Sequence, residues 1–177
     1  MVKKEPQEFK KAFLEALPIK ESEIISNWKG PLTQFTTTMR DFLPEIASIL
    51  SLNLYNGDYY TIDAIFYEDK DVDHFSPDRT YAKYIAIALE HENRLSGTES
   101  EINKLQLFNV PLKVLITYAS DDERDNYLST YSNIIENADV FGDISTLRKQ
   151  LVIFGSCDGN NTNWSFHVYN SGGFVTI

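Results

Sequence analysis

The hydrophobic pattern of the first 50 residues predicts amphipathic helices. Apolar side chains recur at helical spacing over residues 6–17, and we expect this helix to end near Pro18, because proline cannot continue the backbone hydrogen bonds. A second short helical segment is predicted over 21–28, before the chain breaks at WKGP. A third apolar stripe runs over 37–50, where Pro44 must either kink the helix or lie in the first turn of a shorter one.

The middle of the chain has the patterns of three strands. Residues 59–67 are rich in β-branched and aromatic side chains, which predicts a strand after the turn signal NGD. A polar segment over 68–79 is expected to reverse the chain into an antiparallel neighbour over 80–92. The run over 111–118 is nearly all apolar, which is typical of a central strand covered on both faces.

Two more helices and a hairpin complete the expected order. TESE at 98–101 and SDDE at 120–123 each match a capping box, and the second helix is expected to run to about Asn137. QLVIFGSC and WSFHVYN, joined by the turn formers DGNNTN, predict a C-terminal β-hairpin within 149–177. We therefore expect one α/β (α+β) domain over 1–177, with a helical segment at 5–51 and a central mixed sheet flanked by helices.

Composition narrows the classes of protein. The chain has 177 residues, 42% of them hydrophobic, so it is long enough to bury a core as one domain. It has no apolar stretch of the roughly 20 residues that a membrane span needs and no signal-peptide pattern, which favours a cytoplasmic protein without a membrane partner. The net charge of −10 argues against coating nucleic acid through bulk electrostatics, although lysines gather near the start.

Three carboxylates need a chemical reason. Asp63 is expected inside a strand, where an ionised carboxylate must be paired, hydrogen-bonded or bound to a metal. Glu90 and Glu92 share one face of the next strand, while His91 points to the other. If the two strands are antiparallel neighbours, the three acids converge, and hard oxygen ligands of this kind suit Mg²⁺ or Mn²⁺.

This arrangement resembles the PD-(D/E)XK (restriction-endonuclease-like) nuclease superfamily. An Asp on one strand, Glu-x-Glu at the end of the next, a helix and then the apolar strand PLKVLITY are similar to that family's motif and order of elements. The likeness covers about residues 35–140. It implies a restriction-endonuclease-like αβββαβ core over about 35–155, followed by the C-terminal strands, and a Mg²⁺-dependent nuclease acting on DNA or RNA.

The resemblance also implies roles for single residues. Asp63 and Glu90 would hold the metal with the backbone carbonyl of His91, and Glu92 would be a second metal ligand or a base for the attacking water. Glu92 stands where the family usually has lysine, although some restriction enzymes carry Glu at this position. Ile62 stands where the family has proline. A replacement lysine would come from Lys104, and Glu45, in the helix before the sheet, is a further candidate ligand.

Other interpretations of the same residues stay open. Glu90 and Glu92 would be solvated and would meet Arg94 or Lys104 if the strand has already reached the surface. Asp63 would be structural if it binds backbone amides or Tyr84. At the level of function, the alternatives are a non-catalytic acidic binding or immunity/inhibitor-type protein with a basic protein partner, and a subunit that needs a separate DNA-reading partner. A homodimer is also left open.

Overall fold

The computed structural model describes residues 3–76, 79–144 and 146–177. Its helices are α1 (Pro6–Asn27), α2 (Leu32–Leu50), α3 (Thr98–Gln106) and α4 (Asp121–Ala138), with the short 3-10 helices η1 (Asp69–Asp71) and η2 (Leu95–Gly97). Its strands are β1 (Asn53–Tyr55), β2 (Ala64–Tyr67), β3 (Val72–Ser76), β4 (Arg79–Ala82), β5 (Ile87–His91), β6 (Leu112–Tyr118), β7 (Lys149–Cys157), β8 (Thr162–Asn170) and β9 (Gly173–Thr176).

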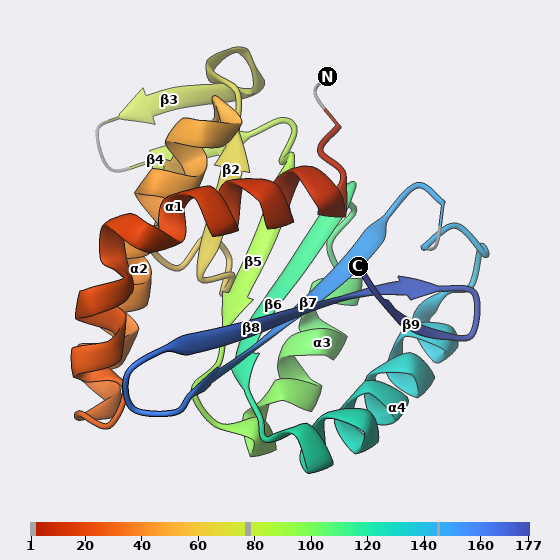
Figure 1. The fold of residues 1–177 in the computed structure, drawn as a ribbon. Coiled ribbons are helices and arrows are strands. Elements are labelled where there is room, and N and C mark those ends of the chain that lie inside the picture. The colour runs from red at the N-terminus through yellow and green to blue at the C-terminus, as the bar shows by residue number, and fades with distance from the viewer. Residues whose placement is uncertain (1–2, 77–78, 145) are drawn as a thin grey trace.

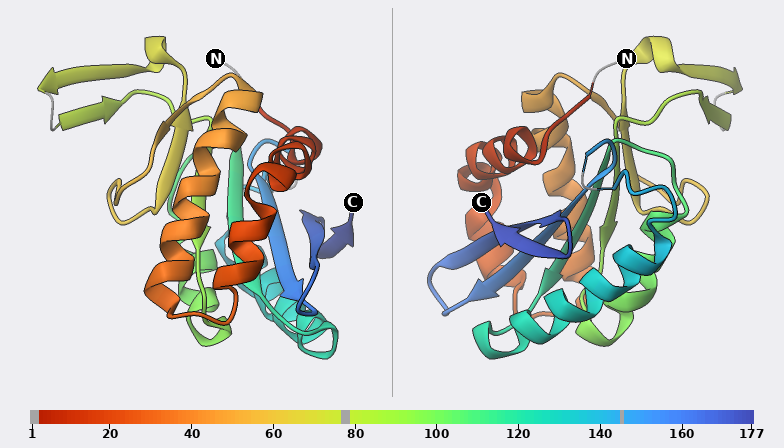
Figure 2. Two further views of the ribbon diagram at one scale, coloured as in Figure 1. Left: turned by 60° about the vertical axis from the view of Figure 1, so that its left-hand side comes forward. Right: turned by 90° about the vertical axis from the view of Figure 1, so that its right-hand side faces the viewer.

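The chain forms three layers, with a sheet between two pairs of helices (Figure 1). Within the described residues the sheet has seven strands, in the order β1-β2-β5-β6-β7-β8-β9. Two buried clusters lie on its two faces, one under α1 and α2 and the other under α3 and α4 (Figure 2). The predicted fold class, a single domain with a mixed sheet flanked by helices, is confirmed.

The predicted antiparallel pairing of the two strands next to Asp63 and Glu90 is confirmed. β2 and β5 are antiparallel, with Ala64 opposite Leu89, whereas β5, β6 and β7 are parallel. Every residue of β6 except Tyr118 is buried, which confirms the prediction of a strand covered on both faces. β7 and β8 form the expected hairpin. β1 was not expected as a separate strand.

The predicted end of the first helix at Pro18 is wrong. α1 continues through Pro18 to Asn27. α2 begins at Leu32, earlier than predicted, and contains Pro44 in its interior. Proline removes one backbone hydrogen bond, but Leu17 and Ile24 are both buried in the same core. Each such burial contributes about 1.5–3 kcal/mol, which offsets the cost of the proline.

Two further local predictions are corrected. The segment over 68–79 is not a plain loop, because it contains η1 and β3, and β3 pairs with β4 in a small separate sheet that projects from the body (Figure 2). The TESE capping box does not form: Gly97 is the N-cap, and Thr98 is already helical. The Thr98 hydroxyl is buried and accepts a hydrogen bond from Tyr131 at 2.5 Å, a tertiary contact that local sequence does not encode. The SDDE capping box is confirmed.

Among the described residues, no helix is both long and apolar enough to cross a membrane.

A buried polar network lies between β6, β7 and α3. The Lys113 amine, which is fully buried, donates to Gln106 Oε1 at 2.9 Å, and Gln106 Nε2 donates to Gln150 Oε1 at 3.0 Å. Burial, followed by the charge of Arg148, lowers the pKa of Lys113 from 10.5 to about 7. The amine therefore loses its proton in the folded protein well before it does so in the unfolded chain.

This shift predicts a pH-dependent contribution to stability. Between pH 7 and 10.5 the unfolded chain binds the Lys113 proton and the folded chain does not, so the contribution of Lys113 to the free energy of unfolding rises with pH. The free energy of unfolding of the native protein minus that of Lys113→Met should grow by up to about 1.4 kcal/mol per pH unit in this window. Urea unfolding of both proteins at several pH values measures the difference, and a flat difference would contradict the burial argument.

Candidate functional site

Asp63 and Glu90 come together where β2 begins and β5 ends. Ala64 pairs with Leu89, so the antiparallel register places Asp63 and Glu90 at the next opposing positions. Asp63 Oδ2 accepts a hydrogen bond from the backbone N–H of His91 at 2.9 Å, which ties the carboxylate to the end of β5. The charge of Asp63 also reaches Glu90, since it helps to raise the pKa of that residue. The expected meeting of these two acids is therefore found.

A strained turn positions Asp63 just before its strand rather than inside it. The expected strand over 59–67 begins only at Ala64, because Tyr59 and Ile62 close a tight turn with two backbone hydrogen bonds. Tyr60 and Thr61 in this turn have positive φ values of 48° and 74°. Such conformations cost about 1–3 kcal/mol each in residues other than glycine and concentrate at functional sites. The turn directs the Thr61 carbonyl toward α3.

Glu90 is the most deeply buried acid of the site. It is 1% exposed, and burial, reinforced by the charges of Asp63 and Glu101, raises its pKa from 4.5 to about 9. The Lys104 amine opposes this rise without cancelling it. A carboxyl group held in this state destabilises the fold when it ionises, unless a cation compensates its charge. The burial of Glu90 is thus a cost that needs a reason.

Lys104 of α3 supplies the positive charge that faces Glu90. Its amine lies 2.8 Å from Glu90 Oε1 and 2.5 Å from Glu101 Oε2, and it donates a hydrogen bond to the Thr61 carbonyl at 2.9 Å. Burial lowers the pKa of Lys104, but the two carboxylates more than offset this, so the net shift is upward and the amine stays charged. Glu101 was missed from the sequence, although its position three residues before Lys104 is the spacing of a helical ion pair.

Glu92 and Glu45 do not join the cluster. Glu92 Oε1 accepts a hydrogen bond from the backbone N–H of Arg94 at 2.8 Å, so this side chain folds back along its own chain. Glu45 lies on α2, which covers the opposite face of the sheet, and its charge reaches Lys20 of α1. Among the residues that the structure describes, no group of three or more His, Cys, Asp or Glu side chains is placed to hold a metal ion. The predicted convergence of three acids is reduced to a pair.

The His91 side chain points away from the acids, as expected from strand alternation. Its ring shares a 2.7 Å hydrogen bond with the Tyr118 hydroxyl and lies near Phe35. Burial, with a smaller effect from Arg40, lowers the pKa of His91 from 6.5 to about 4, so the ring is neutral. In an extended residue the N–H and C=O groups point to the same side, and the N–H of His91 meets Asp63. Its carbonyl therefore lies on the side of Asp63.

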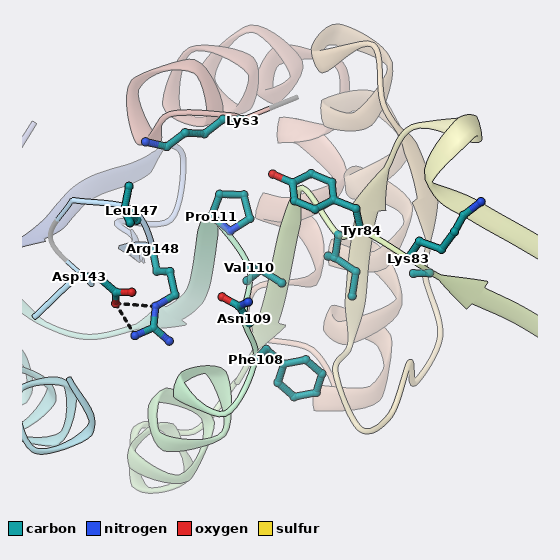
Figure 3. Close-up of a pocket in the computed structure, with 12 residues that line it drawn as sticks. Lys3, Lys83, Tyr84, Phe108, Asn109, Val110, Pro111, Asp143, Leu147 and Arg148 are labelled. Carbon is teal, nitrogen blue, oxygen red and sulfur yellow. Dashed lines mark hydrogen bonds and ion pairs between the residues drawn. The ribbon is translucent and has the colours of Figure 1, made fainter. Parts of the chain in front are cut away.

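The cationic pocket in Figure 3 lies at the opposite end of the parallel strands from this cluster. It has a volume of about 630 Å³, and its lining includes Pro111, which precedes β6, together with Lys3, Lys83 and Arg148. These three cations are already paired with Glu5, Asp73 and Asp143, respectively. The pocket therefore offers no uncompensated charge to a phosphate and is not part of the acid site.

No model of a known protein family matches this chain, and no curated protein sequence matches it. The function has to be argued from the site itself.

Substitutions at Asp63 should separate its structural role from its chemical one. In Asp63→Asn the side-chain oxygen still accepts the His91 N–H, so we expect the free energy of unfolding to change by less than about 0.5 kcal/mol. Asp63→Ala leaves that N–H without its partner and should cost about 1–3 kcal/mol. Chemical denaturation measures both values. Equal stability of the two variants would show that the hydrogen bond does not hold the turn.

Proposed function

We propose that this chain is a divalent-metal-dependent phosphodiesterase that hydrolyses DNA or RNA, acting in the cytoplasm. One observation carries the proposal: two carboxyl groups, one just before β2 and one almost completely buried on β5, meet beside a charged lysine. The main-sheet elements α2, β1, β2, β5, α3 and β6, with the β3–β4 pair inserted between β2 and β5, are compatible with the αβββαβ core that the resemblance to PD-(D/E)XK nucleases implies. Lys104 stands near Glu90, as the resemblance requires of a lysine that replaces the motif lysine.

The donor atoms of the site suit a hard divalent ion. Asp63, Glu90 and the His91 carbonyl would hold Mg²⁺ or Mn²⁺, ions that commonly use one or two carboxylates and leave other positions to water and phosphate. Glu90 Oε1 supports this assignment, because it is buried and the Lys104 amine, 2.8 Å away, is its partner among the described residues. A buried carboxyl oxygen that shares this amine with Glu101 is stabilised further by an additional cation.

The side chains have separate roles in this proposal. A bound metal supplies a water of lowered pKa and stabilises charge on the phosphate oxygens. The His91 N–H and the turn before β2 hold the Asp63 carboxylate in place. The Lys104 amine contacts Glu90, Glu101 and the Thr61 carbonyl, so it stays charged and holds the Glu90 side chain in position. Glu92, turned toward Arg94, has no role in this site.

A cleavage assay tests the proposal. Purified protein is incubated with labelled single- and double-stranded DNA and RNA, with Mn²⁺, with Mg²⁺ and with chelator. We expect cleavage that requires the metal and falls at least about 100-fold in Asp63→Asn and Glu90→Gln. Glu45→Gln is the matched control, because Glu45 lies on the other side of the sheet, and it should cleave like the native protein. Lack of cleavage on every substrate contradicts the proposal.

The second candidate function is a non-catalytic acidic protein that binds a basic partner. Two observations favour it: the net charge of −10, and the contact of Glu90 and Glu101 with a lysine of the same chain. In that case Glu90→Gln leaves every function intact, and the protein associates with a basic partner in a salt-sensitive way. The cleavage assay and a salt titration of partner binding distinguish the two functions.

A further inference from the structure

A small aromatic pocket lies on the other face of the sheet from the acids, at the same end of β5. It has a volume of about 160 Å³ and is lined by Trp28, Leu32, Phe35, Asn93 and Tyr118. Asn93 follows Glu90 by three residues. The carboxyl end of β5 lies between the acids and this pocket. An extended ligand that passes over this end, from one face of the sheet to the other, would therefore meet both.

The three aromatic rings support one another. Trp28, Phe35 and Tyr118 pack edge to face, with ring centroids 5.1–5.2 Å apart in each pair. Leu32, at the start of α2, is 45% exposed and stands at the mouth of the pocket. Rings held in this way form a wall that is ready for a flat ligand and loses little conformational entropy on binding.

Asn93 adds an unused polar atom to this apolar wall. Its Nδ2 donates to Thr36 Oγ1 at 2.6 Å, which fixes the orientation of the amide. Its Oδ1 is buried and accepts no hydrogen bond from any residue that the structure describes. Such an oxygen can accept a hydrogen bond from an amino or imino N–H group. Each type of nucleobase presents at least one group of this kind.

The surroundings of the pocket suit a phosphate chain in spite of the overall negative charge. No side chain caps the N-terminus of α2 next to Leu32, and the Gln34 N–H already donates to the Pro31 carbonyl, so an anion there would meet the backbone amides that precede Gln34. Lys29 and Arg94, the chain neighbours of two lining residues, are exposed. Aromatic walls with positive charge beside them are the usual recognition surface for single-stranded nucleic acid.

We propose that the Trp28–Tyr118 pocket receives one unpaired nucleobase, so that the substrate is single-stranded nucleic acid. This inference rests on the proposed function and names its substrate class. The base stacks against the aromatic wall and donates a hydrogen bond to Asn93 Oδ1, while the backbone passes over the edge of β5 toward Asp63 and Glu90. In a duplex each base is paired and stacked, so no single base is free to enter the pocket. A duplex is therefore a poor ligand.

Binding without metal tests the pocket separately from catalysis. The probe is a short fluorescein-labelled oligo(dT) strand in chelator, with its blunt duplex as the comparison, and the readout is fluorescence anisotropy. We expect the single strand to bind at least about tenfold more tightly than the duplex. Leu32→Glu, which places a carboxylate at the pocket mouth, should weaken single-strand binding by about tenfold or more.

Two features make this test decisive. Glu in the first turn of a helix is favourable, so Leu32→Glu should fold normally, and Ile19→Glu, at a 61% exposed position of α1, is the control with the same change of charge. Ile19→Glu should bind like the native protein. Equal binding of single strand and duplex, or unchanged binding in Leu32→Glu, overturns the inference even if metal-dependent cleavage is found. Loss of binding in Leu32→Glu supports the pocket even if no cleavage is found.

Discussion

Glutamine in place of Glu90 should make the protein more stable and, at the same time, remove its metal-dependent activity. The folded protein keeps the Glu90 proton up to about pH 9, whereas the unfolded chain loses it near pH 4.5. Between these values the unfolded chain binds fewer protons, so the contribution of Glu90 to the free energy of unfolding falls as pH rises. Glutamine has no such proton and fills the same space. We expect Glu90→Gln to be about 1–3 kcal/mol more stable than the native protein at pH 8.

Urea unfolding at a series of pH values measures this effect. The difference between Glu90→Gln and the native protein should be near zero below pH 4.5 and should grow through the window up to pH 9. Glu45→Gln, a half-buried glutamate on α2, is the control and should show no comparable growth. A Glu90→Gln protein that is less stable at pH 8 would mean that the ionised carboxylate stabilises the fold, and that its burial is structural.

Methionine in place of Lys104 should have the opposite effect on stability. The change removes the Lys104 charge, which opposes the rise of the Glu90 pKa through a direct contact, and it also leaves the Thr61 carbonyl without the amine. Above about pH 9, where Glu90 ionises, breaking a buried pair by removing one partner typically costs about 3–5 kcal/mol, and we expect a loss of about 2–4 kcal/mol because Lys104 is partly exposed. Cleavage should fall with it.

A double-mutant cycle separates the pair from other effects. Above about pH 9, Glu90→Gln/Lys104→Met should recover most of the stability lost in Lys104→Met, because no uncompensated carboxylate then remains at position 90. Lys83→Met is the matched control: Lys83 pairs with Asp73 at 3.1 Å, but both side chains are about half exposed, so the change should stay within about 0.5 kcal/mol. Additive effects in the double variant would show that Glu90 and Lys104 are not coupled.

The sequence predicts the parts of the fold that local pattern determines. The apolar run of β6, the SDDE capping box and the β7–β8 hairpin each carry a strong local signal, and each is confirmed. Pro18 misleads because Leu17 and Ile24, on either side of it, are buried in the same core and keep α1 continuous. Thr98 misleads because its hydroxyl binds Tyr131, which lies 33 residues further along the chain.

The same distinction applies to the candidate site. The pairing of Asp63 with Glu90 follows from strand order and alternation, and the position of Lys104 follows from the helix after β5. The direction of Glu92 does not follow, because β5 ends at His91 and alternation no longer applies beyond it. The strained turn at Thr61 is also unpredicted, since a β-branched residue rarely adopts a positive φ.

Calorimetric titration of Mn²⁺ tests the central claim, that Asp63 and Glu90 together bind a divalent cation. The native protein and Glu45→Gln should bind the ion with the same affinity, while Asp63→Asn and Glu90→Gln should bind it at least about tenfold more weakly. No binding to the native protein, or equal binding in all four proteins, would contradict the account.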